Sequence, residues 1–368
     1  MKYAISIFFS FFLSIGTYAQ QAFFLTEEEG ELYTLEERMD RHKVNGASLT
    51  IIRNFELDTT IQLGYRDRED NLLVNEETLF QMGSMTGAIV KFATIRLVSD
   101  GKIKLDTPVN DYLKTWKIEE KGFTKNAPIT VRDLLLERRG FNPIYKPKGY
   151  VAGAEIPTVE QILNGEKPSN LPALALEKNK SKKSSLANDL ILQKLLEDVH
   201  GKDFPTLIQE QVFEPLGMNN SIITSELTSA QKQNACVGYN DNQSRIAGDR
   251  QVYPELAHSG LWSTSTDYAK FVLHIFKAAK GLDNSLLRRD LAILGVKAQH
   301  ENETLILLEK LEGGRNYWGG ATKGFYCQFE ANLEEGWIVV GCSNRQLAWQ
   351  FVNWDLNSRG IEYARRSK

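Results

Sequence analysis

One stretch of this chain constrains its fold more than any other. It is Leu79-Phe80-Gln81-Met82-Gly83-Ser84-Met85-Thr86-Gly87, and it runs directly into the apolar segment Ala88 to Val98. Gly83 predicts a turn, and the apolar segment predicts a helix that enters the core. Ser84 stands at the head of this helix, where a serine can cap free backbone N–H groups or present a nucleophilic hydroxyl. The sequence therefore predicts either a capping serine or a reactive one.

The segments on both sides of this helix predict an α+β fold. Gly46 to Arg53 and Thr59 to Tyr65 have the alternation of paired strands, and strand patterns return from Leu305 onward. Helical patterns fill the middle of the chain, and Thr26 to Asp40 and Trp349 to Arg366 predict a first and a last helix. This order predicts one antiparallel sheet built from both ends of the chain, flanked by the terminal helices, with a mainly helical region beside it. A cleft between the two is the expected binding site.

Residues 1–19 have the pattern of a secretory signal peptide. Lys2 gives a basic start, Ala4 to Ile15 form an apolar run, and Thr17-Tyr18-Ala19 resembles a cleavage site. The alternative is an N-terminal membrane anchor, for which the run is short, since a spanning helix needs ~18 apolar residues or more. We therefore expect a protein exported to the periplasm or the outside. It would consist of a single domain over residues 20–368, with no integral membrane segment after removal of the signal.

Composition and charge narrow the expected partners. The net charge of −3 gives no reason to expect nucleic acid as a partner. The five histidines are scattered and show no short spacing typical of metal ligands, so we expect neither a metal nor a cofactor. Cys327 and Cys342 lie on two predicted strands whose intervening turn would place them opposite each other. In an exported protein they could form a disulfide or remain as two buried thiols.

The chain resembles the secreted serine β-lactamases of class C type, together with the DD-peptidases and esterases that share their fold. The resemblance covers roughly residues 30–345 and depends on several short segments in the family's order. These are Thr78 to Thr86, Gly101 to Leu113, Ile129 to Leu135, Phe213 to Met218, Gly260 to Thr264 and Lys323 to Phe325. The resemblance implies a β-lactamase/DD-peptidase-like fold and a cleft that takes a small-molecule or peptidoglycan-like ligand.

Active members of that family use a Ser-x-x-Lys pair, a Tyr-x-Asn motif and a third motif such as His-x-Gly or Lys-Thr-Gly. The serine attacks a carbonyl, the lysine and tyrosine handle the proton, and backbone amides hold the oxyanion. In this chain the nucleophile position is Ser84, but the lysine position is Gly87. A glycine inside a helix costs about 1 kcal/mol relative to alanine. Helix stability does not explain Gly87, whereas the close approach of another side chain would.

The other two motifs also differ from the family pattern. The tyrosine position aligns with Leu186, which cannot carry a proton, while Asn188 keeps the asparagine of the motif. The third motif begins at Trp318 or Gly319, so the usual histidine or lysine is missing. Losing one positioned acid or base costs about 10²–10⁴ in rate. The sequence therefore predicts that catalysis by the family's mechanism is impaired.

Two side chains are candidates for a replacement base. Lys91 lies two helical turns, or ~10.5 Å, beyond Ser84, and we expect it to be solvated rather than in contact with that serine. His258 precedes a turn that lines the cleft in relatives, and it is either a catalytic candidate or a surface or structurally hydrogen-bonded histidine. Basic residues near the expected cleft suggest an anionic ligand, with binding candidates at Arg138, Arg139, Lys182, Lys183, Lys323 and Gly324.

Two hypotheses about function follow from the sequence. The first is a catalytically impaired or inactive relative that keeps the cleft as a binding surface. The second is a serine hydrolase that uses Ser84 with a non-standard base and acts on an ester, a β-lactam or a D-amino-acid peptide. The observation that discriminates between them is the identity of the side-chain atoms within hydrogen-bond reach of the Ser84 hydroxyl.

Overall fold

A computed structural model describes most of the chain. It covers residues 26–28, 31–120, 124, 127–138, 141–142, 147–176, 185–283, 285–297, 304–307, 309–311 and 313–366. The predicted signal segment, together with Arg139, Lys182 and Lys183, lies outside the described residues. Within the described residues, no helix combines the length and the apolar character needed to cross a membrane.

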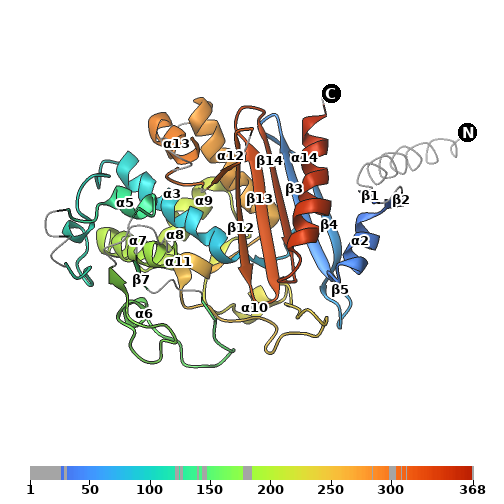
Figure 1. The fold of residues 1–368 in the computed structure, drawn as a ribbon, viewed down its shortest axis with the longest axis horizontal. Helices are drawn as coiled ribbons and strands as arrows, with labels where there is room; N and C mark the ends of the chain where they lie inside the picture. Colours follow the sequence, from blue (N-terminus) through green and yellow to red (C-terminus); the bar gives the residue numbers. More distant parts are fainter. Residues whose placement is uncertain are drawn as a thin grey trace, which may run out of the picture.

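Both ends of the chain build one antiparallel sheet, as predicted. Its seven strands have the order β11-β12-β13-β14-β3-β4-β5 (Figure 1). The pairing of β14 with β3 joins the C-terminal strands to the N-terminal pair, with Val340 opposite Thr50. The strands are β3 (Gly46–Arg53), β4 (Glu56–Asp67), β5 (Leu72–Leu73), β11 (Glu309–Leu311), β12 (Arg315–Thr322), β13 (Phe325–Asn332) and β14 (Trp337–Ser343).

The terminal helices cover one face of this sheet (Figure 1). Helix α2 (Leu35–Arg41), the π-helical turn η4 (Phe351–Asn357) and helix α14 (Ser358–Arg365) contribute side chains to a core cluster that they share with β3 and β14. The predicted first helix was placed too early. A capping box between Thr34 and Glu37 fixes its start, and the preceding residues form β1 (Thr26–Glu28) and β2 (Glu31–Tyr33) instead.

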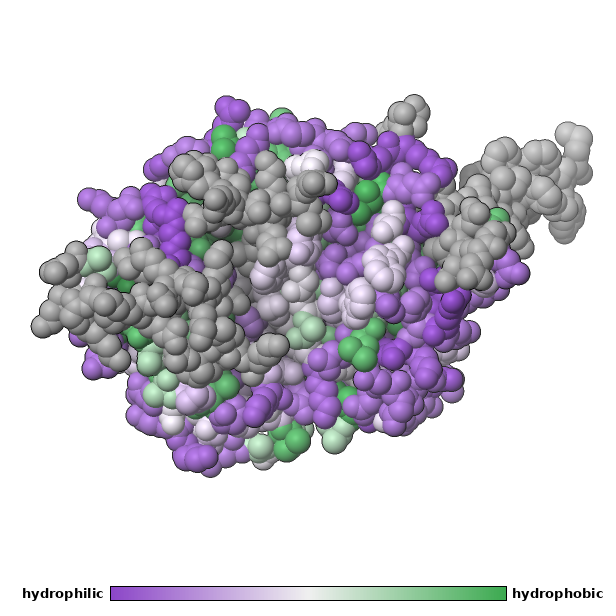
Figure 2. Space-filling view, viewed as in Figure 1, coloured by the Kyte–Doolittle hydropathy of each residue, from purple (hydrophilic) through white to green (hydrophobic). Residues whose placement is uncertain are grey.

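The other face of the sheet carries the helical region, which is built around α3 (Thr86–Ser99). Helix α12 (Ser265–Lys280) packs on the sheet, and α3 lies in the main core together with α7 (Ser185–His200). The remaining helices are α5 (Val131–Leu135), α6 (Val159–Asn164), α8 (Phe204–Ile208), η3 (Gln209–Phe213), α9 (Glu214–Leu216), α10 (Ser229–Lys232), α11 (Leu256–Ser259), α13 (Arg289–Val296) and the short η1 (Gly83–Met85) and η2 (Val109–Asp111). Three small sheets accompany the large one among the described residues. Strands β1 and β2 pair in the first, β6 (Phe80–Gln81), β10 (Leu261–Ser263) and β9 (Ile222–Ile223) form the second, and β7 (Phe141–Asn142) and β8 (Ala175–Leu176) form the third. On the face shown in Figure 2, hydrophobic side chains are scattered among hydrophilic ones, because the apolar residues concentrate inside.

The register between β13 and β14 places Cys327 directly opposite Cys342, as the turn between them predicted. Both residues are fully buried, and both are free thiols, as is Cys236. Burial raises the pKa of the Cys342 thiol, and the neighbouring Cys327 adds to this effect. Of the two alternatives for this pair, the structure has the buried thiols.

Candidate active site

The backbone around Ser84 is fixed by the short strand β10. The Met82 N–H donates to the Leu261 carbonyl at 2.9 Å, and the Leu261 N–H donates to the Thr86 hydroxyl at 3.2 Å. Gly83 makes the predicted turn with a φ of 55°. A Cβ atom on Gly83 would also lie 2.9 Å from the backbone N of Ala321, so only glycine fits between η1 and β12. Ser84 is therefore held between strand β12 and the head of α3.

The Ser84 hydroxyl contacts a backbone carbonyl rather than a base. Its Oγ donates to the Gly319 carbonyl at 3.1 Å, and the Trp318 indole N–H donates to the Ser84 carbonyl at 3.1 Å. Neither η1 nor α3 has a side-chain cap, so the prediction that Ser84 caps the helix is wrong. Within the described part of the chain, no side-chain nitrogen or oxygen is hydrogen-bonded to the Ser84 hydroxyl.

Gly87 faces a buried carboxylate, which explains the glycine. A Cβ atom at Gly87 would lie 3.0 Å from Oδ2 and 3.2 Å from Oδ1 of Asp189, which projects from α7. The expected close approach of another side chain is therefore confirmed. The Asp189 carboxylate lies where the lysine side chain of active relatives would begin.

Asp189 is paired with His258 of α11. The His258 Nδ1 lies 2.8 Å from Asp189 Oδ2, and both residues are buried. Burial raises the pKa of Asp189, while the hydrogen bond from His258 and its charge act in the opposite direction. His258 is thus hydrogen-bonded through one ring nitrogen, and it lies beside the candidate site. Asp189 was not predicted, although an acidic residue directly before the apolar run Leu190 to Leu192 was a usable signal.

A second acid lies three residues before His258. Glu255 is fully buried, and neither of its carboxylate oxygens has a hydrogen-bond partner among the described residues. Burial raises the pKa of Glu255 to about 7, and the charge of His258 opposes part of this change. Two carboxyl groups, those of Asp189 and Glu255, therefore lie around one imidazole in the interior.

Lys91 forms a further buried ion pair on the same helix face as Gly87. Its Nζ lies 2.9 Å from Glu137 Oε1, and the lysine is completely buried. The expectation that Lys91 is solvated is therefore wrong. Glu137 follows α5 in the left-handed conformation, with a φ of 51°, which turns its carboxylate toward α3. Lys91 lies one helical turn after Gly87, against which the Asp189 carboxylate packs, so its positive charge opposes part of the rise that burial causes in the pKa of Asp189.

The remaining predicted positions lie around this cluster without contacting Ser84. Leu186 and Asn188 are both buried in α7, and Leu186 belongs to the main core. Arg138 follows Glu137 and is bound through its backbone N–H to Asp133. Asn188 lies next to Asp189 on α7, and its role in the motif stays a prediction.

Lys323 and Gly324 form the turn between β12 and β13. The Lys323 side chain is exposed, and its backbone N–H donates to the Tyr253 hydroxyl at 3.1 Å. Gly324 has a φ of 86°, and a Cβ atom there would lie 2.7 Å from Gly238 Cα. Gly324 is therefore required by a close backbone approach, and only Lys323 offers a side chain for binding at this turn.

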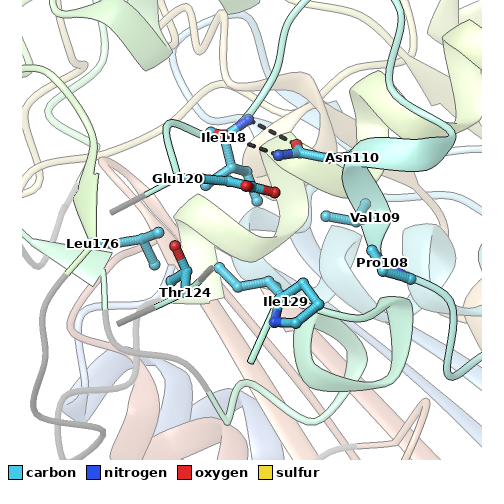
Figure 3. Close-up of a pocket in the computed structure, with 9 residues that line it drawn as sticks. Pro108, Val109, Asn110, Ile118, Glu120, Thr124, Ile129 and Leu176 are labelled. Atoms are coloured by element: carbon cyan, nitrogen blue, oxygen red, sulfur yellow. Dashed lines mark hydrogen bonds between the residues drawn. The ribbon is translucent and has the colours of Figure 1, made fainter. Parts of the chain in front are cut away.

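A pocket in the helical region is built by elements other than those around Ser84. Figure 3 shows it between Pro108, Asn110, Ile118, Ile129 and Leu176, with the Asn110 side chain bound to the backbone of Ile118. None of its lining residues comes from η1, α11 or β12. Among the described residues, no group of three or more His, Cys, Asp or Glu side chains is arranged to hold a metal ion.

The sequence matches the family model described as Beta-lactamase over residues 34–351. The chain belongs to the beta-lactamase family. Relatives include esterase EstB of Burkholderia gladioli, 25% identical over 216 residues, which cover 56% of this chain and 53% of the esterase. The teichoic acid D-alanine hydrolase of Staphylococcus aureus strain MRSA252 is 23% identical over 245 residues, covering 65% of this chain and 57% of the hydrolase. The matches thus span less than two thirds of the length of these relatives.

Solved structures of this beta-lactamase family fold superpose over most of the chain. The crystal structure of FmtA from Staphylococcus aureus has a TM-score of 0.68 at 19% identity and covers 89% of this chain and 88% of its own. EstCE1, a hydrolase with promiscuous acyltransferase activity, has a TM-score of 0.68 at 20% identity, with 90% and 96% covered. At these identities the superpositions show the fold, and they confirm the predicted β-lactamase/DD-peptidase-like architecture.

Proposed function

We propose that this protein is an exported beta-lactamase-family protein whose lysine-dependent acyl transfer is impaired and which uses the surface around Ser84 to bind a ligand. One observation supports this above all others. The Ser84 hydroxyl donates to the Gly319 carbonyl, and the lysine position is taken by Gly87 with the Asp189 carboxylate packed against it. The export rests on the signal-like pattern of residues 1–19.

The electrostatics at this position oppose the family mechanism. A lysine one turn after the serine removes the hydroxyl proton and places a positive charge beside the developing alkoxide. A buried carboxylate reverses the sign of that charge, which disfavours an anionic serine oxygen. The loss of the lysine by itself lowers a turnover of ~10 s⁻¹ to between ~0.1 and ~0.001 s⁻¹. Binding does not need the lysine, so it can persist without fast turnover.

The proposed ligand class rests on the names of the relatives and on basic residues that the sequence predicted near the site. Those relatives are a teichoic acid D-alanine hydrolase and an esterase, and a third is named as a putative penicillin-binding protein of Bacillus subtilis. We therefore propose a small molecule or a peptidoglycan-like fragment that carries a D-amino-acid ester or amide. Of the basic residues predicted near the site, Lys323 and Arg138 lie in the described part of the chain, and they would attract an anionic group on such a ligand.

The test separates binding from turnover. Purified protein and Ser84→Ala are incubated with a fluorescent penicillin and a nitrophenyl ester, and thermal shifts are measured with muropeptide fragments. We expect turnover at least ~100-fold below the usual ~10 s⁻¹ and ligand-dependent shifts of the melting temperature that Ser84→Ala retains. Ester turnover at ordinary enzyme rates that disappears in Ser84→Ala would overturn the proposal.

A further inference from the structure

We propose that His258, held by Asp189, acts as the general base for a slow residual acyl transfer at Ser84. This pair would remove the proton of the Ser84 hydroxyl, which is the role of the lysine in active relatives. This inference rests on the proposed function in one respect, namely that the lysine route is absent because position 87 is glycine. It assigns a catalytic role to His258 and a positioning role to Asp189.

The backbone places His258 beside the Ser84 turn. Two hydrogen bonds attach Leu261 to the residues on either side of Ser84, one to the Met82 N–H and one to the Thr86 hydroxyl. Helix α11, which carries His258, ends two residues before Leu261 and packs against η1 and α3. The Asp189 carboxylate, which binds this imidazole, lies against Gly87, one helical turn after Ser84.

The hydrogen bond from His258 sets the protonation of its ring. Because Nδ1 lies 2.8 Å from Asp189 Oδ2, a neutral imidazole keeps its proton on Nδ1 and has its lone pair on Nε2. This is the arrangement by which a carboxylate orients a histidine base toward a serine. Nε2 is not among the buried polar atoms that lack a partner, and the His258 side chain keeps 10% of its surface exposed.

The chemical step balances without any co-reactant other than water. The Ser84 Oγ leaves the Gly319 carbonyl and gives its proton to His258 Nε2 as it attacks the carbonyl carbon of an ester. The bond between that carbon and the ester oxygen breaks, and the alcohol leaves with the proton from Nε2. Water then attacks the acyl-serine and gives a proton to Nε2, which returns it to the Ser84 Oγ as the acid is released.

The structure offers a matched control for this pair. His274 on α12 is also buried, and its Nδ1 lies 3.2 Å from Asp283 Oδ2. Its ring contacts Phe92, and its hydrogen bond and charge interaction join it to Asp283 rather than to the residues around Ser84. Replacing His274 therefore removes the same chemistry from a place that cannot serve Ser84.

The experiment measures the rate at which a fluorophosphonate probe labels Ser84 during long incubations. We expect Ser84→Ala to abolish labelling, His258→Gln and Asp189→Asn each to slow it by about 10²–10⁴-fold, and His274→Gln to leave it unchanged. Because Asp189 acts through His258, the double variant should label no more slowly than His258→Gln alone. Circular dichroism checks that each variant folds, and imidazole added to His258→Ala should restore part of the rate.

The outcomes separate this inference from the proposed function. Equal labelling of the unmodified protein and His258→Gln, or no Ser84 labelling at all, overturns the role of His258 and leaves the impaired, ligand-binding protein standing. Labelling and ester turnover at ordinary enzyme rates without dependence on His258 overturn both proposals. Slow labelling that depends on Ser84, His258 and Asp189 supports both.

Discussion

Glu255 makes the stability of this protein depend on pH, and Glu255→Gln should remove that dependence. The carboxyl group is fully buried without a hydrogen-bond partner among the described residues, and burial raises its pKa from the ordinary 4.5 to about 7. The folded state therefore holds its proton more tightly than the unfolded state does. Below about pH 4.5 both states are protonated, and the ionisation of Glu255 costs no stability.

The sign and size of the effect follow from that difference. As the pH rises from about 4.5 to about 7, the unfolded chain releases the Glu255 proton while the folded protein keeps it, so stability falls. Above about pH 7 the folded protein carries a buried carboxylate, and the cost levels off at about 3 kcal/mol. This is a large share of the 5–15 kcal/mol that typically stabilises a folded protein.

The assay is urea denaturation of the unmodified protein and Glu255→Gln at several values between about pH 4 and pH 8. The glutamine amide keeps the shape of the side chain, and its own burial cost is the same at every pH. A difference in the free energy of unfolding that is the same at every pH therefore cancels when the two ends of the pH range are compared. We expect Glu255→Gln to gain about 3 kcal/mol relative to the unmodified protein between the two ends of this range. A difference that does not change with pH would refute the reasoning.

Three further substitutions test the cluster below Ser84. Gly87→Ala should lower the melting temperature, because the new Cβ would lie 3.0 Å from the Asp189 carboxylate. In an Asp189→Ala background that contact is absent, so the same change should raise the melting temperature, since alanine favours a helix by about 1 kcal/mol over glycine. In denaturant titrations Lys91→Met should lower the free energy of unfolding by about 3–5 kcal/mol, since it leaves the buried Glu137 carboxylate unpaired. Adding Glu137→Gln to this variant should recover most of that loss. Ser84→Ala should lower stability by about 1 kcal/mol through the lost hydrogen bond to Gly319, and an unchanged melting temperature would contradict this.

Much of the fold was predictable because it depends on local pattern. The alternation of Gly46 to Arg53 predicted β3 with the bounds that the structure shows, and the apolar run after Ser84 predicted α3. The turn between β13 and β14 predicted that Cys327 and Cys342 lie opposite each other, because register in a hairpin follows from its turn. The first helix was misplaced because the capping box at Thr34, rather than the spacing of apolar residues, fixes where it begins.

The sequence by itself determined what is missing at the candidate site. Through the family resemblance it predicted Ser84 as the nucleophile position, with Gly87 where active relatives have a lysine. It also required some side chain to pack against that glycine, since a glycine inside a helix is otherwise unfavourable.

Only the tertiary structure decided which side chains lie beside Gly87, where active relatives have a lysine. Asp189 and His258 are 69 residues apart, and Lys91 and Glu137 are 46 apart, so neither pair could be deduced from local spacing. Ion pairs in the interior depend on which helix faces meet, and that is fixed by the packing of α7 and α11 against α3 and of α5 against α7. The packing of η1 against β12 turns the Ser84 hydroxyl toward the Gly319 carbonyl instead of toward a cap.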